Sequence, residues 1–212
     1  SMTGSSGSTT AWRGTAYGEY KIEQVFVDGM ISYARHSNDL AHNTGLSTLA
    51  VSSNDADQWG ARLAAGWNVA LMPELSLTPQ LRLDWSVLSI DGYTETSSDT
   101  LALRVNEQSI SRTRLSIGAQ ADWALSATVK PFLSAFWGHD SKKTAVNTTA
   151  TFVSGGNAFH VEDANFDGSS YLIGVGVNIF SASNLSGTLS YEYGNSDDVE
   201  SNMFQGKLLW RF

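Results

Sequence analysis

The sequence predicts an all-β protein, an antiparallel transmembrane β-barrel of the outer-membrane type with about nine strands in this chain. Three observations lead to this fold class. Segments of about ten residues alternate between apolar and polar side chains, as in a strand whose two faces meet different surroundings. Aromatic residues gather near the ends of these segments, as at a membrane interface. Short and long connections take turns along the chain, as they do in outer-membrane barrels.

Composition restricts the function further. The chain has 212 residues, of which 42% are hydrophobic and only 16% charged, below the usual quarter for soluble domains. The formal net charge of −8 argues against nucleic-acid binding, which needs a basic patch. Cysteine is absent, so disulfides, thiol nucleophiles and cysteine-ligated zinc are excluded. No apolar run approaches the 20 or so residues of a transmembrane helix.

The alternation is clearest in the segment 75–87. Leu81 and Leu83 fall on one face of this expected strand, and Arg82 and Asp84 fall on the other. The same pattern recurs in the segments 61–71, 113–123, 171–180, 185–193 and 204–212, and more weakly in 12–20, 25–35 and 131–139. These nine segments have the length of tilted strands that cross a bilayer.

The aromatic residues near the strand ends predict a lipid-facing girdle. A soluble β-sandwich or a lipocalin-like binder also alternates and stays a competing interpretation. The membrane barrel is favoured because the polar face carries small and charged residues, as a hydrated lumen would. The predicted girdle residues are Trp67, Trp85, Trp123, Trp137 and Tyr193.

The connections predict an orientation. Short ones are expected at 21–25, 72–74, 126–130 and 181–184, and long polar ones near 36–56, 90–110, 140–169 and 194–202. Outer-membrane barrels have short periplasmic turns and longer extracellular loops. We therefore expect the C-terminal end of the last strand on the periplasmic side.

The chain ends in "FQGKLLWRF". A terminal aromatic preceded two positions earlier by another aromatic resembles the signal that the barrel-assembly machinery reads. Trp210 and Phe212 fit this signal, and Gly206 lies six residues before the end, where five is more usual.

The order of several segments resembles a known family, the translocator domain of monomeric autotransporters (type Va secretion). The resemblance covers Trp12 to Phe212. It rests on "YGEYKIEQVFVDGMISYAR", then "GARLAAGWNVALMPELSLTPQLRLDW", "GYTET", "SRTRLSIGAQADW", "VKPFLSAFWG", "YLIGVGVNIF", "LSGTLSYEYGN" and the final "LLWRF".

This resemblance implies a twelve-stranded barrel with a helix in its lumen, which carries an N-terminal passenger to the cell surface. The implied partners are outer-membrane lipid, the barrel-assembly machinery, periplasmic chaperones, and the chain's own passenger and lumenal helix. It implies no enzyme and no cofactor. The residues expected to face the lumen and contact the helix or passenger are Arg62, Arg82, Asp84, Arg114, Gln120, Asp122, Glu192 and Lys207. The alternative for each is that it hydrates the pore and pairs with its neighbours.

Nine strands with both outer strands running toward the periplasm cannot close into an antiparallel barrel. We therefore expect further strands upstream, three on the family pattern, together with the helix and passenger. On this division, residues 1–11 are an outer loop or a segment added for expression, and 12–212 are the barrel domain.

Two histidine-containing stretches are the candidates for catalysis. In "WGHDSKK", His139 and Asp140 are adjacent and so point to opposite faces of a strand, which makes no dyad. In "FHVEDANFDG", His160 lies near Glu162 and Asp163. The three acids of this stretch could hold calcium but lack the ordered spacing of an EF-hand, and a solvated acidic loop is the favoured interpretation. We expect no catalytic residue and no metal site. The competing function is a small stand-alone outer-membrane barrel: a channel, an adhesin or a structural protein.

Overall fold

The computed structural model of the protein describes residues 5–44, 48–97, 100–140, 147–162, 168–181, 184–196 and 199–210. Every helix or strand assigned within these ranges is a β-strand, so the predicted all-β class is confirmed. No helix in the described ranges is long and apolar enough to cross a membrane.

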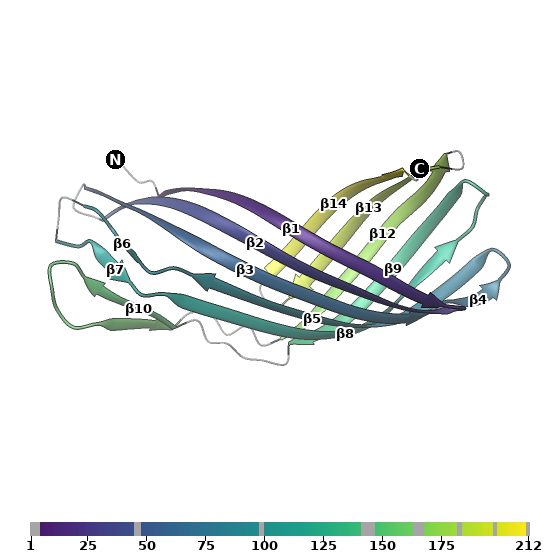
Figure 1. The fold of residues 1–212 in the computed structure, drawn as a ribbon, viewed down its shortest axis with the longest axis horizontal. Helices are drawn as coiled ribbons and strands as arrows, with labels where there is room; N and C mark the ends of the chain where they lie inside the picture. The colour runs from purple at the N-terminus through teal and green to yellow at the C-terminus, as the bar shows by residue number, and fades with distance from the viewer. Residues whose placement is uncertain are drawn as a thin grey trace.

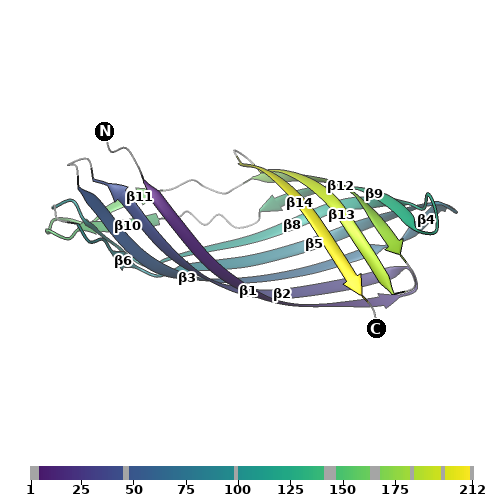
Figure 2. The same ribbon diagram turned by 90° about the horizontal axis from the view of Figure 1, so that it is seen from above.

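Nine long strands form one sheet in which each strand pairs antiparallel with its neighbours. Their number agrees with the nine segments predicted from the alternation. The sheet curls into an open trough (Figures 1 and 2). In their order across the sheet the strands are β1 (Ser6–Ile22), β2 (Val25–Asn43), β3 (Leu49–Trp67), β5 (Leu75–Ile90), β8 (Gln108–Trp123), β9 (Val129–Asp140), β12 (Ser169–Ser181), β13 (Leu185–Ser196) and β14 (Val199–Trp210).

The two ends of the trough differ. At the turn end, β1 and β2 are joined by Glu23 and Gln24 alone, and the short β4 (Val69–Met72) continues β3 beside β5. At the loop end lie the start of β1 and a second, smaller sheet (Figure 1). Since the number of strands is odd, β1 and β14 run in the same direction, and within the described residues each pairs on one side only. The nine strands therefore form an open wall.

Several strands reach farther at the loop end than predicted. Residues 6–11, expected in an outer loop, belong to β1 and pair with 36–41. Most of 36–56 continues the β2–β3 hairpin, and the last hairpin narrows to a pair between Ser196 and Val199. The long polar connections predicted there are thus built mainly as paired strands. Backbone pairing continues where the side chains no longer separate lipid from water, so alternation does not mark those residues as strand.

The second sheet is made from the connections after β5 and β9. Its strands are β6 (Tyr93–Thr94), β7 (Leu103–Val105), β10 (Asn147–Phe152) and β11 (Phe159–Glu162). They lie in the order β11-β10-β7-β6, which repeats the order β12-β9-β8-β5 of the main sheet. A bridge between Val51 and Thr96 joins this part to β3. The second sheet thus prolongs the same wall beyond the loop end of the long strands.

Three phenylalanines, on β2 and β9, cover glycines on the strands beside them. A Cβ added to Gly118 would lie 2.2 Å from the carbonyl oxygen of Ala135 and 2.4 Å from the ring of Phe136. Phe26 closes the space above Gly66 in the same way, and Phe132 the space above Gly176. Close contact between a ring and a bare backbone needs glycine at these positions.

Gly118→Ala is therefore expected to destabilise the folded wall by about 1–3 kcal/mol through overpacking. The backbone oxygen of Ala135 cannot rotate away as a side chain can. Gly29→Ala on β2 is the matched control, because this strand is also paired on both sides and the nearest described atom to the added Cβ, the carbonyl oxygen of Arg62, is 4.0 Å away. Urea unfolding of the membrane-inserted protein measures both, and equal losses would contradict the packing argument.

Candidate functional site

The polar side chains of the long strands share the concave face of the trough. Arg62 on β3 lies opposite Asp84 on β5, which lies opposite Arg114 on β8. Arg114 also donates a hydrogen bond of 3.3 Å to the hydroxyl of Ser196 on β13. Three strand spacings separate β8 from β13, about 14 Å in a flat sheet. Only a sheet curved toward this face brings the two side chains together.

The most buried charge on the concave face is Asp140, at the end of β9. Its side chain is 2% exposed. Arg112 donates to its Oδ2 at 2.7 Å from Nη2 and 2.9 Å from Nε. Arg114 donates to Oδ1 at 2.8 Å and to Oδ2 at 3.0 Å. Two guanidinium groups thus fix one carboxylate, and such charge-assisted contacts are the strong ones.

A second group of charges lies beside the first. Arg62 forms an ion pair with Asp84. The guanidinium of Arg82 lies 3.5 Å from the centre of the Phe136 ring, as a cation–π pair, and donates to the side-chain oxygen of Gln80. A hollow of about 250 Å³ is lined by four arginines from β3, β5 and β8 together with residues of β9, β12, β13 and β14. The carboxylates of Asp84 and Asp140 lie among these arginines. Because the arginines in the lining outnumber them, the hollow is cationic within an acidic protein.

The structure brings four of the eight predicted lumen residues together: Arg62, Arg82, Asp84 and Arg114. Gln120 and Asp122 form a separate pair, with 3.0 and 3.1 Å hydrogen bonds, nearer the turn end of β8. Glu192 pairs across the strands with Gly174 and lies close enough to Arg82 to interact with it electrostatically. Lys207 pairs with Thr188 and lies on the concave face outside the hollow.

Sequence reasoning missed Arg112 and Asp140 as lumen residues. Arg112 shares the face of Arg114 two positions away, so it would have been found if the predicted segment had begun one residue earlier. Asp140 was considered only as a catalytic partner of His139. Its spacing of four residues from Phe136 already placed both side chains on one face of β9.

The convex face is apolar and exposed. Large apolar side chains on it include Leu83 and Val175, which are 43% and 50% exposed, and among the described residues no large side chain is fully buried. A protein in water would place these groups inside. All five predicted girdle residues lie on this face: Trp67, Trp85, Trp123, Trp137 and Tyr193.

Aromatic residues bound the convex face at both ends. Toward the loop end, Tyr33 packs against Trp12 and Trp59, with ring centres 5.3 and 4.9 Å apart. Toward the turn end stands Trp67. Eight residue steps along β3 separate Trp59 from Trp67, about 26 Å of strand. At a tilt of about 35–45° this length spans about 18–21 Å across the membrane, most of the apolar band of about 25 Å in outer-membrane barrels.

Of the predicted assembly signal, Gly206 and Trp210 lie on the convex face of β14, and Trp210 is 73% exposed. Phe212 lies outside the described residues. Whether these three residues act as a signal stays a prediction.

The catalytic candidates are not brought together. His139 stacks on Trp137 on the convex face, with ring centres 6.2 Å apart, whereas Asp140 points to the concave face. His160 contacts the hydroxyl of Thr149 at 2.9 Å. Ser141 and Asp163 lie outside the described residues. Within those ranges no group of three or more potential metal ligands occurs.

A wall that is apolar and aromatic-bounded outside and polar inside defines a β-barrel protein of the outer membrane. Its sequence matches the family Autotransporter beta-domain over residues 1–192. The chain therefore belongs to this family, and the family assignment drawn from the segment order is confirmed. Its function is that of an outer-membrane translocator of a passenger domain.

Known proteins agree with this assignment. The fold is similar to the translocator domain of autotransporter NalP from Neisseria meningitidis, with a TM-score of 0.78 at 18% identity over 98% of this chain and 68% of that one. A putative uncharacterized protein, YaiT of Escherichia coli K12, is 24% identical over 180 residues, which are 83% of this chain. Lipase 1 of Photorhabdus luminescens is 24% identical over 104 residues. The chain spans about a sixth of the length of these relatives (17% and 16%).

Proposed function

We propose that the cationic hollow on the concave face holds the helix or the passing passenger chain inside the barrel. The observation that carries this proposal is the gathering of arginines from three strands around two carboxylates. The arginines of the hollow attract the acidic side chains of a helix or an extended chain that lies along it.

The wall is completed in this proposal by further strands beside β1. The free edge of β1 supports this, because unpaired backbone groups do not face lipid. The match to the NalP translocator domain also supports further strands, because this chain covers only 68% of that domain. Insertion by the barrel-assembly machinery after escort by periplasmic chaperones belongs to the same proposal, with Gly206, Trp210 and Phe212 as the signal.

The orientation we propose places the loop end outside the cell and the turn end in the periplasm. The two-residue turn between β1 and β2 at one end, and the second sheet at the other, support it. The five girdle residues then face the lipid headgroup region.

Single cysteines test this arrangement, because the chain has none of its own. In intact cells that express the full-length protein, a membrane-impermeant maleimide is expected to label His160→Cys. Gln24→Cys is expected to stay unlabelled until the outer membrane is permeabilised. External protease should release the passenger from the same cells. Labelling of Gln24→Cys alone would reverse the orientation, and a passenger that stays protected would overturn the translocator function.

The arginines are tested in the same cells. Arg62→Gln combined with Arg82→Gln should leave His160→Cys labelled while less passenger becomes accessible to protease. Lys207→Gln is the control, since Lys207 lies on the concave face outside the hollow. Equal export in both variants would remove the proposed role of the hollow.

A further inference from the structure

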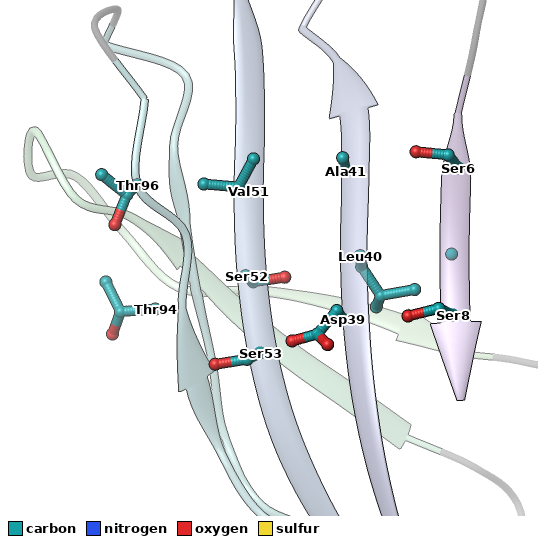
Figure 3. A pocket seen from close by; sticks show the side chains of 11 residues that line it. Ser6, Ser8, Asp39, Leu40, Ala41, Val51, Ser52, Ser53, Thr94 and Thr96 are labelled. Carbon is teal, nitrogen blue, oxygen red and sulfur yellow. The ribbon is translucent and has the colours of Figure 1, made fainter. Parts of the chain in front are cut away.

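Beyond the loop-end aromatic residues Trp12, Tyr33 and Trp59, polar side chains become frequent on the convex side of the wall, and apolar ones appear on the concave side of β5, β8 and the second sheet. Between the aromatic residues at the two ends, the convex side is apolar and the concave side is polar. On the loop-end side of these residues, the polar side chains on the convex side are Ser6, Ser8, Asp39, Ser53, Thr94 and Thr96. They line a hollow of about 570 Å³ (Figure 3). Arg35 and Asp55 form an ion pair of 2.9 Å on the same side. The hydrogen bond from Arg35 keeps the pKa of the Asp55 carboxyl below its usual value.

On the loop-end side of these aromatic residues, β5 and β8 carry apolar side chains on the concave side. Leu88 on β5 pairs directly with Ile110 on β8, and Ile90 follows on the same face. This face continues into the second sheet. Val51 pairs with Thr96 on the convex side, so Glu95 points to the concave side, where it lies 3.7 Å from His42. Tyr93 shares the face of Glu95 and lines the same hollow as Leu88 and Ile90.

The apolar face extends across the second sheet to its far strands. Tyr93 pairs with Val105, Val105 with Ala150, and Ala150 with Phe159. The rings of Phe152 and Phe159 lie 5.6 Å apart, and these side chains are still 37% and 36% exposed. The continuous surface formed by Leu88, Ile90, Tyr93, Ile110, Phe152 and Phe159 is called the vestibule face below.

Polar side chains accompany the vestibule face in a way that suits an extended chain. A hollow of about 450 Å³ on it is lined by Asn54, Gln58 and Gln108 as well as by Leu88, Ile90 and Tyr93. Amide side chains both donate and accept hydrogen bonds. They can therefore satisfy the backbone of a segment whose apolar side chains rest on the aliphatic and aromatic groups.

The position of the vestibule face decides among possible occupants. It continues the concave side of the wall, so it borders the mouth of the lumen and faces away from the surrounding membrane. Lipid, or a second barrel in the membrane plane, would meet the convex side instead, which is largely polar at the loop end. The polypeptide that leaves the lumen passes this face.

We propose that the vestibule face binds the passenger segment that emerges from the lumen, as an extended, largely apolar stretch of the protein's own chain. The proposal rests on the translocator function and adds a site to it. Burial of apolar side chains against the vestibule face stabilises the segment outside the barrel. Bound there, the exported segment does not slip back, and the next part of the passenger folds from a fixed point.

Photo-cross-linking in living cells tests the site in the full-length protein. The variants Phe159→p-benzoylphenylalanine and Phe152→p-benzoylphenylalanine place the reactive group on the vestibule face. The matched controls replace their neighbours His160 and Thr151, which point to the other face of the same strands. After irradiation, cross-linked peptides are identified by mass spectrometry.

Cross-links from positions 152 and 159 to the protein's own passenger, absent at positions 151 and 160, are the expected result. Cross-links to lipopolysaccharide or to the same domain of a second copy would overturn the proposal, as would equal yields from both faces or none from either. Protease treatment of the same cells separates this outcome from the translocator function. If the passenger is exposed without any cross-link, only the vestibule site fails.

Discussion

Arginine in place of Val175 or of Leu83 is expected to lower the free energy of unfolding of the membrane-inserted protein by about 2–4 kcal/mol. Both side chains lie on the convex face and are about half exposed. Val175 lies in the middle of β12, and Leu83 pairs with Leu63, which lies midway between Trp59 and Trp67 on β3. A guanidinium costs most at the midplane, where water is farthest away.

The control places the same charge on the other face. Gln120→Arg is expected to change stability little, because residue 120 lies on the concave side beside the carboxylate of Asp122. All three variants are compared by urea titration of the protein folded into lipid vesicles. If arginine is tolerated equally at 175, 83 and 120, the convex face does not meet lipid.

Asp140→Asn is expected to lower the free energy of unfolding by about 3 kcal/mol. The change preserves the shape of the side chain but leaves Arg112 and Arg114 without their counter-charge. Breaking a buried ion pair costs about 3–5 kcal/mol, and the lower figure applies because the Arg112 side chain is 40% exposed and remains hydrated. Urea unfolding in vesicles measures the loss.

The convex pair of Arg35 and Asp55 offers a matched comparison. These side chains are 50% and 40% exposed, so Asp55→Asn should have little effect. The low pKa of Asp55 means that its contact is present at neutral pH and is lost only on acidification below the usual carboxylate range. Arg114→Gln should also cost less in the Asp140→Asn background than alone. Independent, additive effects would show that Asp140 does not hold the two arginines.

The sequence sufficed for the strands inside the membrane, because two different solvents force side chains to alternate there. Leu83 and Arg82 were placed on opposite faces from spacing alone, and the structure agrees. Alternation gives no signal where both faces of the β2–β3 hairpin are polar or mixed. The sequence therefore predicts a long connection where residues 36–43 and 49–56 form paired strands. Their pairing depends on backbone hydrogen bonds, which leave little trace in side-chain type.

The candidate site was predictable as a face and not as a cluster. Period two assigns Arg62, Arg82, Asp84 and Arg114 to the concave side, but it treats Lys207 and Glu192 identically. Which of these residues meet depends on the register of five or more strands and on the curvature of the sheet. The contact between Arg114 and Ser196 joins residues 82 positions apart, a distance over which local patterns carry no information.

The change of side-chain facing near the loop end also limits which changes in the length of this hairpin the protein can tolerate. The side chains change face across the irregular residues 91–92 and 106–107, where a Cβ on Gly92 would lie 2.9 Å from the backbone nitrogen of Glu107. Because facing has a period of two, an insertion or deletion of one residue in either arm of this hairpin would turn the side chains beyond it to the opposite face unless a bulge absorbs the shift. We therefore expect changes in the length of each arm to come in steps of two residues or together with a bulge.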